Sequence, residues 1–235
     1  MRAPAVIIPP GGLGLQTNLG AFYSLDNTLN DATGNMSALT NNNSVTFSSP
    51  GGTLTAVTNA AIFASASSKY LSVAAASAIN MGAVSFSVQL WYYNTANGGA
   101  IPLDKYVGFG NGDFTVGATF TGGASPITFA ACRANNTAIS SGNQSKDTWH
   151  HYVFTYNSSG GAQNLYVDGS AVSNNTASNP PSGTGNLHIG ASGSPGNYVD
   201  GRIALVGLWK SRVLSAGDVT ALWNSGAGLS FAAMA

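Results

Sequence analysis

The sequence predicts an all-β protein, built as a two-sheet antiparallel β-sandwich with one short C-terminal helix. The segment 149–169 holds two runs rich in aromatic and β-branched residues, which favour strands. The turn-forming run 157–161 separates them. Strand-like runs recur about every ten residues, as in sandwiches, and the chain contains no Glu among its 8 acidic residues. Together these features favour strands and turns over helices.

The chain of 235 residues is long enough for one large sandwich domain. Residues 1–18 are predicted to form an extended N-terminal arm, because its three prolines disfavour both helix and central strand. Residues 19–235 are predicted to form a single domain. The arm either packs on its own domain or reaches a neighbouring subunit through its apolar residues, which are Val6, Ile7, Ile8, Leu13 and Leu15.

The long central strand is expected at 83–93. Phe86, Val88 and Leu90 alternate with polar and aromatic residues that include Gln89 and Trp91, so one face is predicted to join the core. Shorter strands are expected on either side of it, at 21–25, 61–64, 70–73, 101–109, 113–120, 127–133 and 186–190, with another long strand at 198–209.

Two local signals define the C-terminal third of the chain. Asp168-Gly169 predicts a type I′ hairpin turn, because both residues tolerate positive φ. Ser215 followed by Asp218 predicts a capping box at the start of a helix. Gly226 is expected to end that helix in the left-handed conformation.

Several motifs also carry a family resemblance. The runs 149–153 (WHHYV) and 165–169 (LYVDG) resemble the paired signature of the laminin-G-like branch of the concanavalin A-like lectin/glucanase superfamily. The runs 86–91 (FSVQLW), 201–203 (GRI) and 212–222 (RVLSAGDVTAL) resemble further motifs of that family. The resemblance covers residues 20–229 and implies a jelly-roll sandwich. It identifies a fold more specifically than a function.

The acidic residues argue against catalysis of the kind that the resemblance implies. Glucanases of the superfamily use two Glu on one strand, and this chain has none. A retaining glycosidase needs two carboxylates about 5–5.5 Å apart, yet no two Asp stand two or four residues apart on a predicted strand. His150 and His151 are adjacent on a strand, so they should point to opposite faces and not share one metal. A non-catalytic protein is expected.

A sugar-binding site would use exposed aromatics with Asn and Asp at the loops. Two predicted turns carry such residues, and the alternative is that they are ordinary strand-end residues. The sequence leaves open whether both turns lie at one end of the sandwich. The candidate ligand-binding residues are Tyr106, Phe109, Asn111, Asp113, Asn197 and Tyr198.

A structural calcium is a second candidate. The run 31–35 (DATGN) resembles an early family element that helps to bind calcium in some relatives, and Asp31 and Asn35 could supply oxygen ligands. The alternative is a turn in which Asp31 accepts hydrogen bonds from its own backbone. Ala204 stands where many relatives carry an acidic residue, which removes one candidate ligand.

Charged residues make up 7% of the chain and the net charge is zero. A basic surface for nucleic acid is therefore not expected, and no run of about 20 apolar residues predicts a membrane span. A weakly charged surface favours association. Two functions remain open. One is a structural component of a virion surface, such as a phage capsid decoration or tail/fibre protein, whose arm contacts other subunits and whose domain touches host glycans. The other is a cellular or secreted, extracellular carbohydrate-binding or adhesion module.

Overall fold

The structure is a computed structural model that describes residues 12–96, 99–108, 111–119, 127–132, 137–177 and 184–235. For residues 106–108, 111–112, 118–119, 127–132 and 137 it describes the backbone alone.

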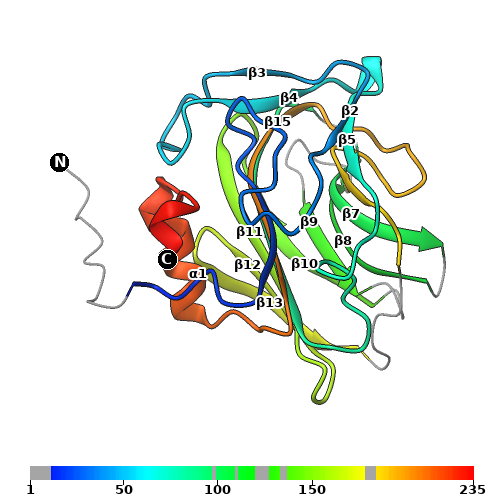
Figure 1. Ribbon diagram of the computed structural model, residues 1–235, viewed down its shortest axis with the longest axis vertical. Coiled ribbons are helices and arrows are strands. Elements are labelled where there is room, and N and C mark those ends of the chain that lie inside the picture. Colours follow the sequence, from blue (N-terminus) through cyan, green and yellow to red (C-terminus); the bar gives the residue numbers. More distant parts are fainter. Residues whose placement is uncertain (1–11, 97–98, 109–110, 120–126, 133–136, 178–183) are drawn as a thin grey trace.

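Within these ranges, fifteen strands form two antiparallel sheets, which confirms the predicted sandwich (Figure 1). The eight-stranded sheet has the spatial order β13 (Ser170–Thr176), β12 (Ala162–Val167), β11 (Trp149–Tyr156), β6 (Phe86–Asn94), β15 (Gly201–Lys210), β4 (Ala60–Phe63) and β3 (Thr46–Ser48), and β1 (Leu19–Tyr23) also pairs with β15. The seven-stranded sheet has the order β10 (Thr137–Asn143), β9 (Ile127–Cys132), β8 (Asn111–Thr119), β7 (Ala100–Gly108), β14 (Leu187–Ile189), β5 (Tyr70–Val73) and β2 (Thr40–Asn42).

The main core lies between the two sheets. On β6, Phe86, Val88 and Leu90 face this core and are fully buried. Leu103 of β7 and Phe114 of β8 face it from the other sheet. The predicted alternation of the central strand is thus confirmed, because side chains point to opposite faces at successive strand positions.

A second apolar layer covers the outer face of the eight-stranded sheet. Trp91 and Trp209 from the sheet pack there with Val219 and Leu222 of the helix α1 (Ala216–Trp223), and Figure 1 shows α1 beside β11–β13. The sheet is therefore buried on both faces over much of its area. The described ranges also contain three short 3-10 helices: η1 (Ser65–Ser67), η2 (Asn224–Gly226) and η3 (Ala232–Met234).

The end of the predicted arm packs on its own domain. The Leu13 N–H donates to the Ala235 carbonyl at 2.6 Å and the Leu15 N–H to the Met234 carbonyl at 2.9 Å, and Leu15 is 1% exposed. For Leu13 and Leu15, contact with the same chain thus replaces the predicted reach to a neighbouring subunit. Val6, Ile7 and Ile8 lie outside the described residues.

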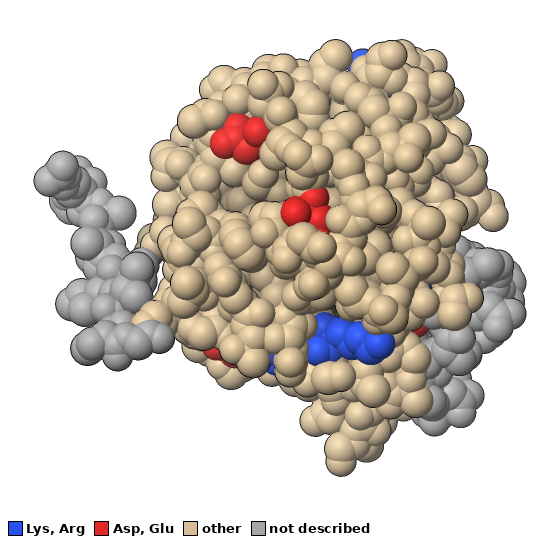
Figure 2. All heavy atoms as spheres, in the orientation of Figure 1, with Lys and Arg blue, Asp and Glu red and all other residues tan. Residues whose placement is uncertain are grey.

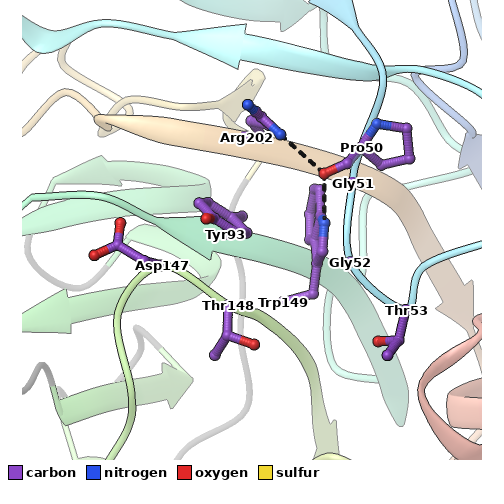
Figure 3. Close-up of a pocket in the computed structure, with 9 residues that line it drawn as sticks. All are labelled: Pro50, Gly51, Gly52, Thr53, Tyr93, Asp147, Thr148, Trp149 and Arg202. Atoms are coloured by element: carbon purple, nitrogen blue, oxygen red, sulfur yellow. Dashed lines mark hydrogen bonds between the residues drawn. The ribbon is translucent and has the colours of Figure 1, made fainter.

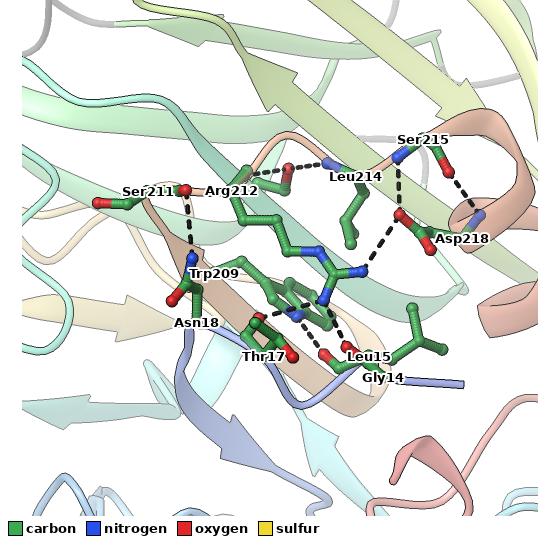
Figure 4. Close-up of polar contacts among 11 residues, drawn as sticks. Gly14, Leu15, Thr17, Asn18, Trp209, Ser211, Arg212, Leu214, Ser215 and Asp218 are labelled. Atoms are coloured by element: carbon green, nitrogen blue, oxygen red, sulfur yellow. Dashed lines mark hydrogen bonds and ion pairs between the residues drawn. The ribbon is translucent and has the colours of Figure 1, made fainter. Parts of the chain in front are cut away.

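Arg212 fixes this N-terminal segment to the rest of the molecule (Figure 4). Its Nη1 donates to the carbonyls of Gly14 at 2.7 Å and Thr17 at 3.1 Å. Its Nη2 lies 3.3 Å from Asp218 Oδ2 at the start of α1. One guanidinium group therefore links residues from both ends of the chain.

The predicted turn and cap are both present. Asp168 and Gly169 have φ values of 50° and 79°, the signs that a type I′ turn requires. Ser215 and Asp218 form the capping box at α1. The helix ends at Asn224, whose φ is 48°, and not at Gly226 as predicted. Asparagine also tolerates the left-handed conformation. No helix in the described ranges has the length and apolar character needed to cross a membrane.

Candidate ligand-binding site

A pocket of about 320 Å³ lies on the outer face of the eight-stranded sheet, where β11 begins. The loop that joins β3 to β4 forms one wall and the residues that precede β11 form another (Figure 3). The residues that line the pocket are Pro50, Gly51, Gly52, Thr53, Tyr93, Asp147, Thr148, Trp149 and Arg202.

The floor of the pocket comes from three neighbouring strands at one level. Tyr93 of β6 is the register partner of both Trp149 on β11 and Arg202 on β15. The rings of Tyr93 and Trp149 meet edge-on with centroids 5.6 Å apart. The Arg202 guanidinium carbon lies 5.3 Å from the Tyr93 ring centroid, within the range of a cation–π contact. The antiparallel register thus assembles an aromatic and cationic floor.

The β3–β4 loop is attached to this floor through the Pro50 carbonyl. That oxygen accepts hydrogen bonds from Trp149 Nε1 at 3.0 Å and from Arg202 Nη1 at 2.9 Å, and both side chains converge on it in Figure 3. Gly51 and Gly52 follow with φ values of 65° and 66°, a conformation that glycine adopts without steric cost. These contacts hold the loop beside the pocket.

A glycine also sets the position of Arg202. Gly201 has a φ of 140°, and a Cβ added there would lie 2.0 Å from the Tyr93 carbonyl oxygen. Only a residue without a side chain permits this close approach of β15 to β6.

Polar groups form the rim of the pocket. Asp147, Thr148 and Thr53 are exposed, and the Asp147 N–H donates to the Asn94 carbonyl at 2.9 Å. The pocket therefore combines an aromatic surface with a carboxylate, hydroxyls and a guanidinium group, so it offers both donors and acceptors to a polar ligand. Asp147 is the one carboxylate among the lining residues that the structure describes.

The prediction that Asp113 is an exposed ligand-binding residue is wrong. Its side chain is fully buried and lies 2.8 Å from Lys105 Nζ. Asp113 was expected at the start of a strand beside the turn-like run 110–112, whereas β8 already begins at Asn111 and encloses Asp113. Phe109 and the side chains of Tyr106 and Asn111 lie outside the described part of the structure, so their predicted role stays a prediction.

Asn197 and Tyr198 lie at the other end of β7 from the hairpin that joins β7 to β8. Asn197 is exposed and its carbonyl accepts from the Ile101 N–H at 2.9 Å, near the start of β7. A nine-residue strand is ~26 Å long. The half-buried Tyr198 lies 6.2 Å from Tyr70, measured between ring centroids. Asn197 and Tyr198 therefore lie away from the end of β7 at Gly108, and neither of them lines the pocket.

Asp31 forms the turn that was the alternative to calcium binding. Its carboxylate accepts hydrogen bonds from the backbone N–H groups of Phe22 at 2.8 Å, Thr33 at 3.1 Å and Met36 at 2.9 Å. The Asn35 side chain donates to the Leu19 carbonyl at 3.4 Å. Among the described residues, no group of three or more His, Cys, Asp or Glu is placed to hold a metal ion. Calcium binding stays a prediction, and these contacts favour the turn.

The side chains of the two adjacent histidines make different contacts, which agrees with the prediction that they point to opposite faces. His150 Nδ1 lies 2.7 Å from Asp168 Oδ2. His151 Nε2 lies 3.0 Å from Gln89 Oε1, and its ring stacks on Trp91 with centroids 5.1 Å apart. Complete burial lowers the pKa of His151 to about 3, although nearby Asp168 opposes the shift. Both histidines therefore belong to the scaffold.

Sequence reasoning missed the residues that build the pocket. The aromatic residues on the non-core face of β6 were a partial signal, and Arg202 lies inside a recognised motif. The missing information was the register of β11, β6 and β15, which places Trp149, Tyr93 and Arg202 side by side.

Three solved structures of low sequence identity resemble the fold. Domain 4 of AbnA, an extracellular GH43 arabinanase from Geobacillus stearothermophilus in complex with arabinotriose, has a TM-score of 0.62 and 17% identity, over 87% of this chain and 97% of that one. The binding domain of Paraclostridial Mosquitocidal Protein 1 has a TM-score of 0.68 and 14% identity, over 90% and 53% of the two chains. The binding domain of botulinum neurotoxin DC in complex with SialylT has a TM-score of 0.64 and 13% identity, over 90% and 52%. This chain thus matches about half the length of the two toxin binding domains.

A comparison with curated protein sequences finds no relative. A family model does match, and its description is the concanavalin A-like lectin/glucanases superfamily. The match covers residues 65–220, more than half of the chain, and includes the motifs on β6, β11, β12 and β15. The chain therefore belongs to the concanavalin A-like lectin/glucanases superfamily.

Proposed function

We propose that this protein is a non-catalytic glycan-binding module that binds a sugar in the pocket around Tyr93. The observation that carries the proposal is the alignment of Trp149, Tyr93 and Arg202 at one level of the sheet, beside the exposed carboxylate of Asp147. A sugar presents both apolar C–H faces and hydroxyl groups, so a site for it needs an aromatic surface together with fixed polar groups.

Each part of the pocket has a role in this proposal. The Tyr93 ring would contact the C–H face of a sugar and remove apolar area from water. Asp147 would accept hydrogen bonds from hydroxyl groups, and bonds to an ionised acceptor are the stronger kind. Thr148 and Thr53 would donate or accept through their hydroxyls. The volume of about 320 Å³ lies at the lower end of the range of small-molecule sites, which suits a short glycan segment.

The absence of an acid/base pair supports binding without hydrolysis. Glycoside hydrolysis of the common kind requires two carboxyl groups on either side of the bond to be cleaved. The chain contains no Glu, and of the lining residues in the described chain only Asp147 is acidic. A bound glycan would thus meet a single carboxylate.

The structural neighbours add support of a general kind. One of them is a domain of an arabinanase in complex with arabinotriose, and another is a toxin binding domain in complex with SialylT. Because their identities to this chain are 17% and 13%, the likeness concerns the fold, and the glycan class must come from experiment. An extracellular or surface-displayed location is part of the proposal.

A glycan array tests the proposal directly. The purified full chain is expected to bind a defined set of glycans, and Tyr93→Ala is expected to lose that signal. Tyr166→Ala is the matched control, because Tyr166 is another half-buried tyrosine on the outer face of the same sheet and does not line the pocket. No binding by the wild-type chain, or equal binding by Tyr93→Ala, would refute the proposal.

Display on a virion surface, as a capsid decoration or tail/fibre component, stays a finer prediction. Its support is the low charge of the chain together with an apolar N-terminal segment. Figure 2 shows one face of the molecule on which charged side chains are few and scattered, and such a surface favours association. Mass spectrometry of purified virions from the source would detect the protein if this prediction is correct, and its absence from them would contradict it.

A further inference from the structure

Three polar side chains that do not line the pocket meet inside the sandwich. Lys105 of β7 and Asp113 of β8 are both fully buried. Lys105 Nζ lies 2.8 Å from Asp113 Oδ2 and 2.9 Å from Oδ1 of Asn80, which belongs to the loop that precedes β6. An amine, a carboxyl group and a carboxamide are therefore in mutual contact around one nitrogen atom.

Apart from Asp113 and Asn80, apolar side chains lie beside Lys105 on its own strand and on the neighbouring one. Its position on β7 is two residues from Leu103, so both side chains point into the core between the sheets. Its register partner is Phe114, whose ring centroid lies 5.7 Å from that of Phe86. A charged group in such a place loses the solvation of water.

This environment favours the uncharged forms of the two titratable groups. Burial lowers the pKa of Lys105 and raises the pKa of Asp113, while the attraction between the two groups opposes both shifts. Asp113 Oδ2 also accepts from the Met81 N–H at 3.2 Å, whereas its Oδ1 is buried without a hydrogen-bond partner among the described residues. A neutral amine is a nucleophile, and a neutral carboxylic acid can donate a proton.

We propose that Lys105 and Asn80 form an intramolecular isopeptide bond, with Asp113 as the group that transfers the proton. Lys105 Nζ attacks Asn80 Cγ, and a new C–N bond forms as the bond from Cγ to Nδ2 breaks. Asp113 takes the proton from Nζ and a proton is delivered to the departing Nδ2, so that ammonia leaves and Asp113 returns to its starting form. The step needs no oxidant, reductant or further reactant.

Asn80 is the electrophile in this assignment for a chemical reason. Asp113 contacts the same amine, but a carboxyl group that exchanges protons with an amine becomes a carboxylate, which resists nucleophilic attack. A carboxamide keeps its electrophilic carbon at every stage. The bond would join residues 25 apart in sequence and fasten the loop before β6 to the opposite sheet.

The mass of the intact, denatured wild-type chain is the decisive measurement. It is expected to be lower than the sequence mass by one ammonia, and peptide mapping is expected to find the Asn80 and Lys105 peptides joined. An unmodified mass would overturn the proposal. A deficit of one water in place of ammonia would move the bond to Asp113 and would also overturn it.

Two variants separate the bond from other losses of ammonia. Asn80→Ala and Lys105→Arg are each expected to show their full sequence masses, because one lacks the electrophile and the other replaces the amine by a guanidinium that stays protonated. A succinimide at an asparagine also releases ammonia, but it would persist in Lys105→Arg and would leave the two peptides separate. Asn80 is only partly buried, so Asn80→Ala should fold. Its Tm is expected to fall by roughly 6–12 °C, as for the loss of a crosslink that closes a loop of this length.

Discussion

Arg202 connects the loop and the floor of the pocket through a single side chain. Its Nη1 donates to the carbonyls of Pro50 at 2.9 Å and Ser49 at 3.3 Å, while its guanidinium group lies over the Tyr93 ring. The planar guanidinium suits both contacts, since it carries several donors in a fixed geometry and stacks on aromatic faces. The position of the proposed glycan-binding surface therefore depends on the shape of this residue as well as on its charge.

Replacing Arg202 by lysine should weaken glycan binding although the positive charge is kept. The lysine ammonium cannot stack on Tyr93 and reach the Pro50 carbonyl in the same way, so the loop should lose its fixed position. We expect Kd to rise by about tenfold, which corresponds to ~1.4 kcal/mol, when the glycan found on the array is titrated calorimetrically. Lys69→Arg is the control outside the pocket and should leave Kd unchanged. An unaltered Kd for Arg202→Lys would show that the guanidinium geometry has no role.

His151 should make the free energy of unfolding depend on pH. In the folded protein its pKa is about 3 because burial disfavours the charged form, whereas in an unfolded chain the pKa of histidine is about 6.5. Below about pH 6.5 the unfolded chain therefore binds a proton that the folded chain does not, and stability falls by up to ~1.4 kcal/mol per pH unit until the folded pKa is reached.

The variant His151→Phe tests this contribution. Phenylalanine keeps an aromatic ring beside Trp91 and does not titrate. Urea unfolding at several pH values between about 6 and 4 should give a slope that is smaller by ~1.4 kcal/mol per pH unit in the variant. The buried carboxylates and His188, whose pKa burial also lowers, contribute to both proteins and cancel in the difference. Equal slopes would mean that His151 is not held neutral.

At the level of single elements, β15 carries most of the connections that organise the molecule. It pairs with β6, β4 and β1, and it places Arg202 in the pocket and Trp209 in the outer apolar layer. Its sequence revealed a long strand and a family motif. It did not reveal the irregular register between Ala204 and Gly207, where Leu205 has a φ of 52°. A bulge of this kind changes which residues face outward and is set by packing on both sides.

The start of β15 offers a test with a matched control. Gly201→Ala should destabilise the protein strongly, because the new Cβ would lie 2.0 Å from the Tyr93 carbonyl oxygen. Gly34→Ala places a side chain at a φ of +76° with no atom within 4 Å, so it carries the conformational cost of about 1–2 kcal/mol alone. Urea unfolding should show a larger loss for Gly201→Ala. If the two losses are equal, β15 does not approach β6 as closely as described.

For the whole molecule, the sequence predicted the parts that depend on local pattern. Alternation on β6, the turn at Asp168-Gly169 and the capping box at Ser215 are each determined by a few neighbouring residues, and all three are present. The pocket depends on contacts between segments that are far apart in the chain, such as Pro50 with Trp149 and Arg202. Local pattern contains no information on such contacts. This explains why the burial of Asp113, which stands beside a turn-like run, was not predicted.

The N-terminal segment illustrates the same limit. Its apolar residues predicted that it packs against other apolar residues, but the sequence did not decide between its own domain and another subunit. The backbone N–H groups of Leu13 and Leu15 donate to the C-terminal tail at Ala235 and Met234, and their side chains pack in the same apolar cluster as Met234. A contact between the two ends of a chain has no local signature, and it appears only once the sheets bring both ends to one face.

The most direct test of the proposed function is an NMR titration, in which the glycan identified on the array is added to isotopically labelled protein. Glycan binding around Tyr93 should shift the amide signals of the pocket residues first, above all those of Gly51, Gly52, Thr53, Asp147 and Thr148. Signals from Asn197 and Tyr198, which do not line the pocket, should remain in place. Shifts confined to Asn197 and Tyr198, with the pocket signals unchanged, would contradict glycan binding around Tyr93.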